Sequence, residues 1–423
     1  MADIINSFGR RVDQLATTNP AAARRLLLAG FRAIGIKFRH FPDSRLPPSR
    51  QYIAGYVNRV VCRMLTHPEQ AALVSVFMPC ELLHAMDVLP MCAELYASFI
   101  NGSNAEAFFA EAAEAEGIPE SFCSYHKVLL GSAYAGVLPA PSIIVNTSLV
   151  CDANNLTFRE LAGHYKIPQY YVDVPPERSE DAVAYVADEL RELSAFLEDH
   201  TGRRLDNKRL HETLVRSRDT AEALRACMRQ KRGVWLPGDV TSEMYEIYAV
   251  HNALGTSEAQ RYAEQLLLDL KKARPAHGIR LLWLHTIPIW QEPVRELFNL
   301  NYRYQIVGCD INYEGLIGID PSKPYESMAR RLIYSRWNGG DERVTAAVEA
   351  AKLLDVDGVV CFCHWGCKQT MGLSGVLKAS LEAAGFPTLI LNGDGCDRRN
   401  ASDGQTATRL NAFLEMLEGQ RRG

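Results

Sequence analysis

The sequence lacks several motifs and segments by which common functions are recognised. It has no G-x-x-x-x-G-K-[ST] motif, so a P-loop for ATP is not expected, and no G-x-G-x-x-G motif that would indicate the usual NAD or FAD site. No apolar run approaches the roughly 18 residues that span a bilayer. The first residues also lack the basic and apolar regions of a signal peptide. We therefore expect a cytoplasmic protein that does not span or bind a membrane.

An excess of charge of one sign is also missing. Lys and Arg number 46, Asp and Glu number 50, and the net charge is −4. Nucleic-acid binding needs a basic stripe that neutralises phosphates, so nucleic acid is not an expected partner. The chain has 423 residues, of which 47% are hydrophobic and 23% charged, a composition that predicts two or three folded domains rather than disorder.

Short apolar runs separated by helical patterns predict an α/β protein with parallel sheets, because strands covered on both faces are continuously apolar. We expect a helical N-terminal region over 1–70, a first α/β domain over 71–180, a helical insert over 181–275 and a second α/β domain over 276–423. The predicted strands are residues 73–78, 142–147, 170–174, 279–284, 304–308, 358–362 and 388–391.

The chain contains eleven cysteines, an odd number that in a reducing compartment favours metal-binding or catalytic thiolates over disulfides. Binding sites in open parallel sheets form beyond the carboxyl ends of the strands. Seven cysteines follow a predicted strand or begin a predicted helix: Cys80, Cys123, Cys151, Cys309, Cys363, Cys367 and Cys396. The other four, Cys62, Cys92, Cys227 and Cys361, fall inside helix or strand patterns and are expected to be small buried hydrophobic residues.

The spacing of these cysteines favours iron and sulfide over zinc. Zinc sites usually show paired C-x2-C motifs or nearby histidines, whereas here Cys363 and Cys367 form one C-x3-C and the other cysteines are far apart. Thiolates from distant loops, enclosed between two domains, suit an iron–sulfur cluster.

Five segments resemble the 2-hydroxyacyl-CoA dehydratase and benzoyl-CoA reductase superfamily over roughly residues 70 to 420. They are Met78-Pro79-Cys80-Glu81-Leu82-Leu83-His84-Ala85, Cys123-Ser124-Tyr125, Cys151-Asp152, Asp357-Gly358-Val359-Val360 and Thr408-Arg409-Leu410-Asn411-Ala412-Phe413-Leu414-Glu415. The resemblance implies two Rossmann-like domains and a [4Fe-4S] cluster held by Cys123, Cys151 and Cys367. It also implies a separate ATP-hydrolysing iron–sulfur activator, a homodimer, which agrees with the missing P-loop.

Cys80, Cys363 and Cys396 are additional to that pattern. With the segments around His364 and Asp394, they resemble the double-cubane cluster proteins of the same superfamily, in which six cysteines hold an [8Fe-9S] cluster. Cys309 would then be a spare cysteine. Cys361 is an alternative to Cys363, because the two residues share a face of one strand.

The resulting expectation is an ATP-coupled, low-potential iron–sulfur reductase component that forms a homodimer and reduces a small molecule at a double cubane. The alternatives are a subunit of a 2-hydroxyacyl-CoA dehydratase or benzoyl-CoA-type reductase with one [4Fe-4S] cluster, and a non-catalytic electron-transfer or cluster-storage protein. His126, His364 and Lys368 are the candidate catalytic residues.

Three further expectations concern the surroundings of the cluster. Lys127 is a further candidate proton donor. Gly366 and Gly395 would let the backbone approach the cluster. The adjacent Arg398 and Arg399 could bind an anionic substrate.

Overall fold

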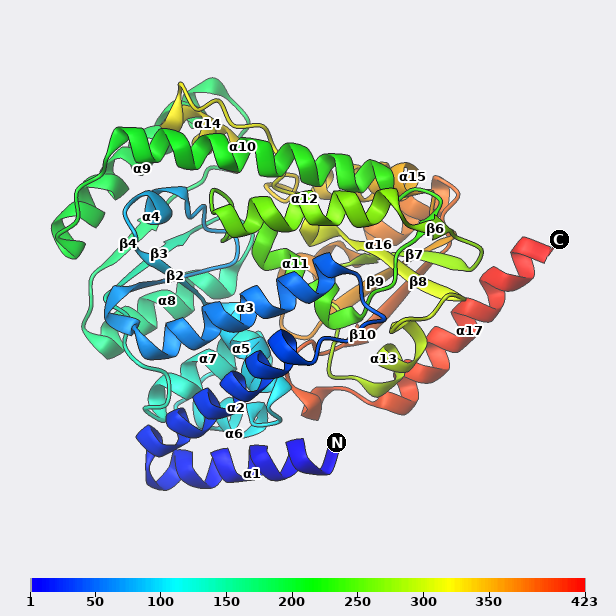
Figure 1. Cartoon of the computed structure of the whole chain (residues 1–423), viewed down its shortest axis with the longest axis horizontal. Coiled ribbons are helices and arrows are strands. Elements are labelled where there is room, and N and C mark those ends of the chain that lie inside the picture. Colours follow the sequence, from blue (N-terminus) through cyan, green and yellow to red (C-terminus); the bar gives the residue numbers. More distant parts are fainter. Residues whose placement is uncertain (1, 423) are drawn as a thin grey trace.

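The computed structural model describes residues 2–422 and contains two four-stranded parallel sheets linked and covered by helices (Figure 1). The first sheet has the strand order β2-β1-β3-β4, and all of its pairings are parallel. Its strands are β1 (Ala71–Val74), β2 (Leu89–Cys92), β3 (Ile143–Thr147) and β4 (Gln169–Val172). The α/β class with two Rossmann-like units is thereby confirmed.

The second sheet has the order β10-β9-β7-β8 and is also parallel throughout. Its strands are β7 (Ile279–Leu284), β8 (Tyr304–Cys309), β9 (Gly358–His364) and β10 (Thr388–Gly393). Every residue of β7 and β9 is buried, as expected for central strands with helices on both faces. The four apolar runs predicted in this half of the chain lie within these four strands.

Side-chain alternation along β7 shows how the second sheet builds two cores. Trp283 packs with Phe362 against α13 (Glu292–Phe298) and α17 (Asp403–Arg422). The neighbouring Leu282 and Leu284 face the opposite way, toward α15 (Gly340–Leu354) and α16 (Lys368–Ala383). Residues that alternate along a strand therefore end in different cores.

The first sheet is covered by the N-terminal helices on one face and by α9 on the other, where α14 joins α9. The helix α14 therefore packs on the first sheet although it lies within the segment 276–423 that was expected to form the second domain.

The long helices α10 and α12 pack on each other, and α10 contacts both α4 and α15, so it spans the two units (Figure 1). The remaining helices are α1 (Ala2–Thr18), α2 (Pro20–His40), α3 (Pro48–Thr66), α4 (Glu81–Ala85), α5 (Ala93–Gly102), α6 (Glu106–Ala115), α7 (Ser124–Tyr134), α8 (Asp152–Tyr165), α9 (Glu180–Thr201), α10 (Asn207–Gln230), α11 (Val240–Val250), α12 (Ser257–Lys271) and α14 (Pro324–Ile333).

Several strands differ from the sequence prediction; β9, for example, runs to His364 rather than to residue 362 and so includes Cys363. The first strand ends at Val74 rather than at residue 78, because the chain then turns toward Pro79 and the helix α4 that follows Cys80. The four-residue strand β2 was not predicted, and it contains Pro90. Proline cannot donate to a ladder and is tolerated at an edge, which is where β2 lies in the sheet.

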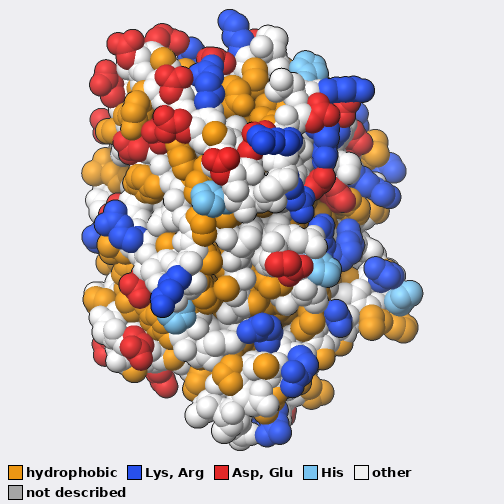
Figure 2. Space-filling model, turned by 90° about the vertical axis from the view of Figure 1, so that its left-hand side faces the viewer, with side chains coloured by type: hydrophobic (Ala, Val, Ile, Leu, Met, Phe, Trp, Pro, Cys, Tyr) orange, Lys and Arg blue, Asp and Glu red, His pale blue; other side chains and the backbone are white. Residues whose placement is uncertain are grey.

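Along residues 2–422, none of the helices combines the length and the apolar character required to cross a bilayer. The face shown in Figure 2 carries acidic and basic side chains together with scattered hydrophobic ones, rather than a surface of one charge.

Candidate functional site

A cavity of about 990 Å³ lies where the carboxyl ends of strands from both sheets meet. Its walls include residues that follow strands of the first sheet and residues that follow strands of the second. The strand-end residues are Val76 and Phe77 after β1, Cys92 and Glu94 at β2, Val150 and Cys151 after β3, His285 and Thr286 after β7, Ile311 after β8, and His364 and Cys367 at β9. The cavity therefore lies where parallel sheets usually place their ligands.

Four cysteines line this cavity, and each is the residue immediately before a helix. Cys92 precedes α5, and its thiol lies 3.5 Å from Glu94 Oε2. The other three, Cys123, Cys151 and Cys367, precede α7, α8 and α16. In the described chain none of the three sulfurs caps its own helix, so each is available to another partner. The positive end of a helix dipole stabilises a nearby thiolate, and here three such ends meet.

Glycine at position 366 permits this convergence. Gly366 has a φ of +78°, and a Cβ atom there would lie 2.6 Å from the backbone nitrogen of Cys123. A larger residue would push the loop that carries Cys367 away from the start of α7. The expected backbone approach at Gly366 is therefore toward the polypeptide around Cys123.

Electrostatics also couples the three thiols. Burial raises the pKa of Cys123 well above its usual value, and the neighbouring Cys151 and Cys367 raise it further. Burial likewise raises the pKa of Cys151. Three thiolates at such close quarters would repel one another unless a positively charged group lay between them, and metal binding removes thiol protons.

Among residues 2–422, no three His, Cys, Asp or Glu side chains converge at the distances of one bound metal ion. Thiolates are the protein ligands of iron–sulfur clusters, so Cys123, Cys151 and Cys367 are the donor set that would hold the cluster implied by the resemblance.

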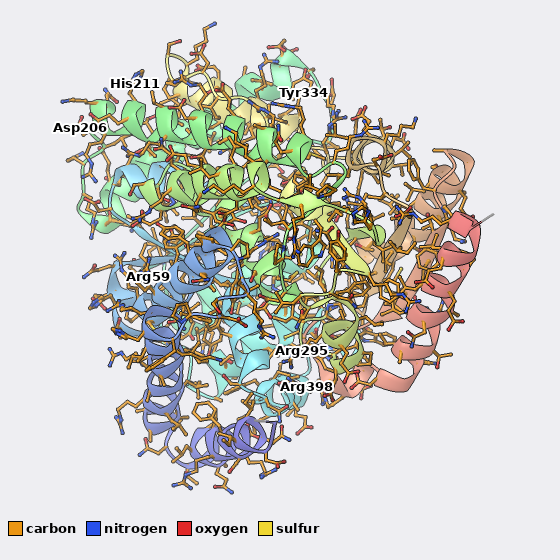
Figure 3. All side chains as sticks on the ribbon, turned by 45° about the vertical axis from the view of Figure 1, so that its right-hand side comes forward. Arg59, Asp206, His211, Arg295, Tyr334 and Arg398 are labelled. Atoms are coloured by element: carbon orange, nitrogen blue, oxygen red, sulfur yellow. The ribbon has the colours of Figure 1, made fainter. Side chains whose placement is uncertain are left out.

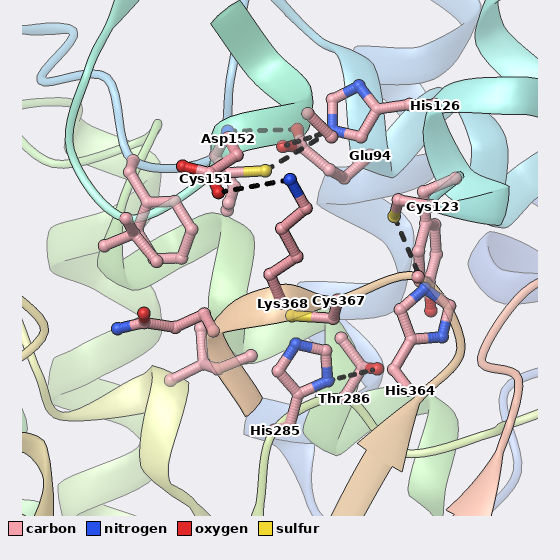
Figure 4. Close-up of a pocket in the computed structure, with 18 of the residues that line it drawn as sticks. Glu94, Cys123, His126, Cys151, Asp152, His285, Thr286, His364, Cys367 and Lys368 are labelled. Carbon is pink, nitrogen blue, oxygen red and sulfur yellow. Dashed lines mark hydrogen bonds and ion pairs between the residues drawn. The ribbon is translucent and has the colours of Figure 1, made fainter. Parts of the chain in front are cut away.

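His364 is held in one tautomer by two contacts. Its Nδ1 accepts a hydrogen bond of 3.0 Å from the backbone N–H of Gly395, so the proton of the neutral ring lies on Nε2. That Nε2 lies 3.4 Å from the sulfur of Cys123 and donates to it (Figure 4). Burial lowers the pKa of His364, so the ring serves as a neutral donor.

His126 and Glu94 form a second polar group on the cavity wall. His126 Nε2 lies 3.8 Å from the sulfur of Cys151 and 3.9 Å from Glu94 Oε1 (Figure 4). Burial lowers the pKa of His126 to about 3 and raises the pKa of Glu94 to about 7. Glu94 Oε2 also accepts a 3.0 Å hydrogen bond from the backbone N–H of Val76, which holds the carboxyl group in place.

Lys368, the third candidate catalytic residue, lies at the rim. Its side chain is 83% exposed, and its Nζ is 4.0 Å from Asp152 Oδ2. His364 and His126 are thus placed deep in the cavity beside cysteine sulfurs, whereas Lys368 lies at the entrance.

The structure does not bring the three additional cysteines to the cavity wall. Cys363 lies in the core under α16 with Cys361, on the opposite face of β9 from His364, and a hydrogen bond from the Cys361 thiol lowers the pKa of Cys363 to about 7. Cys80 is buried and donates to the carbonyl of Met78 over 3.2 Å. Cys396 is buried with its sulfur 3.7 Å from the carbonyl of Ala97. The spare Cys309 donates to the carbonyl of His285 over 2.8 Å.

Ion pairs engage the other basic residues that were expected to act near the cluster. Lys127 is buried in an ion pair of 2.7 Å with Glu114. Arg398 is paired with Glu106, and Arg399 lies 2.8 Å from Glu114 and 2.7 Å from Asp397. Figure 3 places Arg398 in the lower part of the molecule. The two arginines therefore join the loop after β10 to α6.

Several cavity residues were missed by the sequence analysis. Cys92 and Glu94 were missed because β2 was not predicted. His285 and Thr286 directly follow a strand that was predicted, so the strand-end rule applied to all polar residues would have found them. The side chains of His285 and Thr286 interact over 3.1 Å, and burial lowers the pKa of His285 well below its usual value.

The backbone is strained beside one of the thiols. Val150 has a φ of +71°, a left-handed conformation that is costly for a β-branched residue, and it immediately precedes Cys151. Backbone strain of this kind concentrates at functional sites, where surrounding structure maintains it.

Together, the fold and the site define a two-lobed α/β protein that presents helix-terminal thiols to a cavity between parallel sheets. Residues 75–417 match the family described as 2-hydroxyglutaryl-CoA dehydratase, D-component, and the chain belongs to that family. The predicted family relationship is confirmed.

The chain is similar to three curated relatives. It is 24% identical over 338 residues to the (R)-phenyllactyl-CoA dehydratase alpha subunit of Clostridium sporogenes, covering 75% of this chain and 81% of that one. It is 24% identical over 382 residues to lactoyl-CoA dehydratase subunit alpha of Anaerotignum propionicum, covering 80% and 89%. It is 22% identical over 309 residues to (R)-2-hydroxyglutaryl-CoA dehydratase subunit alpha of Acidaminococcus fermentans, covering 66% and 61%.

Proposed function

We propose that this chain is a subunit of a 2-hydroxyacyl-CoA dehydratase that holds one [4Fe-4S] cluster on Cys123, Cys151 and Cys367. The observation that carries the proposal is that these three thiols, each at the start of a different helix, face one large cavity and lie close enough for Cys151 and Cys367 to raise the pKa of Cys123. A cubane with three protein ligands supplies one-electron chemistry and an iron open to the substrate.

The chain's own residues supply binding and proton transfer around that group. Apolar and aromatic side chains form most of the cavity wall. Glu94, with a pKa near 7, can hold or release a proton at its carboxyl group close to neutral pH. His126 separates Glu94 from Cys151, and His364 Nε2 keeps a hydrogen bond on the sulfur of Cys123.

The proposal includes two protein partners. Since the sequence has no P-loop, a separate ATP-hydrolysing iron–sulfur activator supplies the electron. The three relatives are alpha subunits by name, which favours a different second subunit over the homodimer expected from the sequence. Large apolar side chains exposed at the cavity rim, namely Leu156 (62%), Trp365 (42%) and Met371 (48%), support contact with a partner there.

The second candidate function is the double-cubane reductase. The observation in its favour is that Cys396 is buried close enough to Cys123 for each charge to affect the other. The positions of Cys80 and Cys363 weigh against it, since neither residue lines the cavity.

Iron and sulfide analysis of protein kept free of oxygen tests the proposal. We expect about four irons per chain. Serine variants of Cys123, Cys151 and Cys367 should each lose most of that iron, whereas Cys363→Ser, the matched control four residues from Cys367, should retain it. About eight irons, with loss in the Cys363, Cys80 and Cys396 variants, would support the double cubane instead.

A dehydration assay provides the second test of the proposal. The loaded chain, mixed with its partner subunit, activator and ATP, should eliminate water from a 2-hydroxyacyl-CoA thioester. Full iron content without dehydration of any such thioester would reject the dehydratase assignment and leave the reductase or an electron-transfer role.

A further inference from the structure

The walls of the cavity carry information about the acyl group that it accepts. Aromatic side chains line it on several sides, among them Phe77, Phe122, Tyr245, Tyr248 and Trp337. These residues come from both halves of the chain, and the rings of Phe77 and Trp337 meet with their centres 5.7 Å apart. A volume of about 990 Å³ lies at the upper end of the range for small-molecule sites.

Positive charge is nearly absent from the same walls. Among the described lining residues, Lys368 is the one Lys or Arg side chain, and it lies at the rim beside Asp152. The cationic Arg343 is close, but it lies behind Trp337, with its guanidinium 3.8 Å from the ring centre, and is paired with Asp310.

The remaining polar groups inside the cavity cannot neutralise a carboxylate. The His126 ring is buried between the Cys151 sulfur and Glu94 Oε1, and the His285 ring is buried beside Thr286. Glu94 is itself an acid and would repel a second carboxylate. A dicarboxylic acyl group would therefore bury an unpaired charge, whereas an aryl group would meet aromatic and aliphatic surface.

We propose that the cavity selects uncharged acyl groups of aromatic size and rejects those that carry a second carboxylate. This inference rests on the proposed function and adds the substrate class. The aromatic walls provide the attraction, and the lack of an internal cation provides the discrimination against the charged competitor.

Binding of three thioesters to the cluster-loaded chain, measured by calorimetry without oxygen, tests the inference. The probes are phenyllactyl-CoA, lactoyl-CoA and 2-hydroxyglutaryl-CoA, which share the thioester and the 2-hydroxyl group. Burying the additional phenyl ring should make phenyllactyl-CoA bind roughly 10- to 100-fold tighter than lactoyl-CoA. The dicarboxylic thioester should be the weakest ligand.

A pair of variants tests whether the lack of a cation in the cavity causes the discrimination against a second carboxylate. Ile289 lines the cavity from the loop after β7, and Ile289→Lys would add a cation where Ile289→Met adds only a neutral chain of similar length. The lysine variant should shift the preference toward 2-hydroxyglutaryl-CoA by at least about tenfold relative to the methionine control.

The outcomes separate this inference from the proposed function. Equal binding of all three thioesters, or tightest binding of 2-hydroxyglutaryl-CoA by the unaltered chain, would overturn the substrate class while leaving the dehydratase proposal in place. An unchanged preference in Ile289→Lys would overturn the electrostatic discrimination. If none of the thioesters binds, the proposed function fails and the inference fails with it.

Discussion

Removing one buried carboxylate should release the loop that orients His364. Asp394 is 0% exposed and accepts four hydrogen bonds. Its Oδ1 accepts from Ser124 Oγ at 2.5 Å and from the backbone N–H groups of Cys396 and Asp397 at 2.8 Å each. Its Oδ2 accepts from Asn400 Nδ2 at 3.0 Å. Asp394 therefore joins the loop after β10 to the first residue of α7, next to Cys123.

The number of hydrogen-bond donors left without an acceptor sets the expected loss of stability. In Asp394→Ala the two backbone N–H groups and the Ser124 hydroxyl lose their shared acceptor, and an unsatisfied buried donor costs about 1–3 kcal/mol. Three such donors, each in the lower part of that range, sum to about 4 kcal/mol, so the free energy of opening the loop should fall by about that amount. Asp394→Asn keeps an oxygen for the same donors but loses the charge, so we expect the free energy of opening the loop to fall by about 2 kcal/mol.

Hydrogen exchange of residues 393–400, followed by mass spectrometry, measures this opening directly. At 1.4 kcal/mol per tenfold, exchange should accelerate about 700-fold in Asp394→Ala and about 30-fold in Asp394→Asn. The strand β4, which belongs to the other sheet, serves as the internal control and should exchange at the unaltered rate. Iron retention should also fall in the alanine variant, because Gly395 N–H then no longer orients His364. Unchanged protection of residues 393–400 in both variants would refute this reasoning.

Three further predictions concern stability of the cluster-free chain in urea. The raised pKa of Glu94 means that the folded state binds a proton more tightly than the unfolded state. The free energy of unfolding, compared with that of Glu94→Gln, should therefore fall by about 3 kcal/mol as pH rises from 4.5 to 7. A difference between the two proteins that does not change with pH would contradict this. Val150→Gly should be at least as stable as Val150→Ala, the reverse of the usual order, because glycine alone relieves the positive φ. Arg331→Met should cost about 3–5 kcal/mol by leaving the fully buried Glu81 unpaired, whereas Arg330→Met, which breaks an exposed pair, should cost less than about 1 kcal/mol.

The sequence alone determined much of the fold. Of the six residues 279–284, all but Arg280 are large and apolar, and the six form β7. Strands of this kind can be recognised because burial on both faces requires apolar side chains at most consecutive positions. Where a run was short and held a proline, as in β2, local pattern was insufficient, because its place at the sheet edge depends on pairing with β1.

The sequence also placed the three thiols of Cys123, Cys151 and Cys367 at element ends, and each does precede a helix. Only the tertiary structure decided which cysteines share a cavity. Cys363 and Cys367 are four residues apart, yet one lies in the core beneath α16 and the other faces the cavity, because the first is still in β9 and the second has passed its end.

Long-range packing likewise decided the roles of the charged residues. Arg398 and Arg399 look like a free cationic pair in the sequence, but Arg398 is neutralised by Glu106 and Arg399 partly by Glu114, both from α6 and almost 300 positions earlier, while Asp397 is the local partner of Arg399. Nothing in the local sequence distinguishes Glu94, whose pKa is raised by burial in the folded chain although the hydrogen bonds from Cys92 and Val76 act in the opposite direction. Local composition encodes where strands and helices begin, whereas the partners of a charge and the contents of a cavity depend on segments that meet only when the chain is folded.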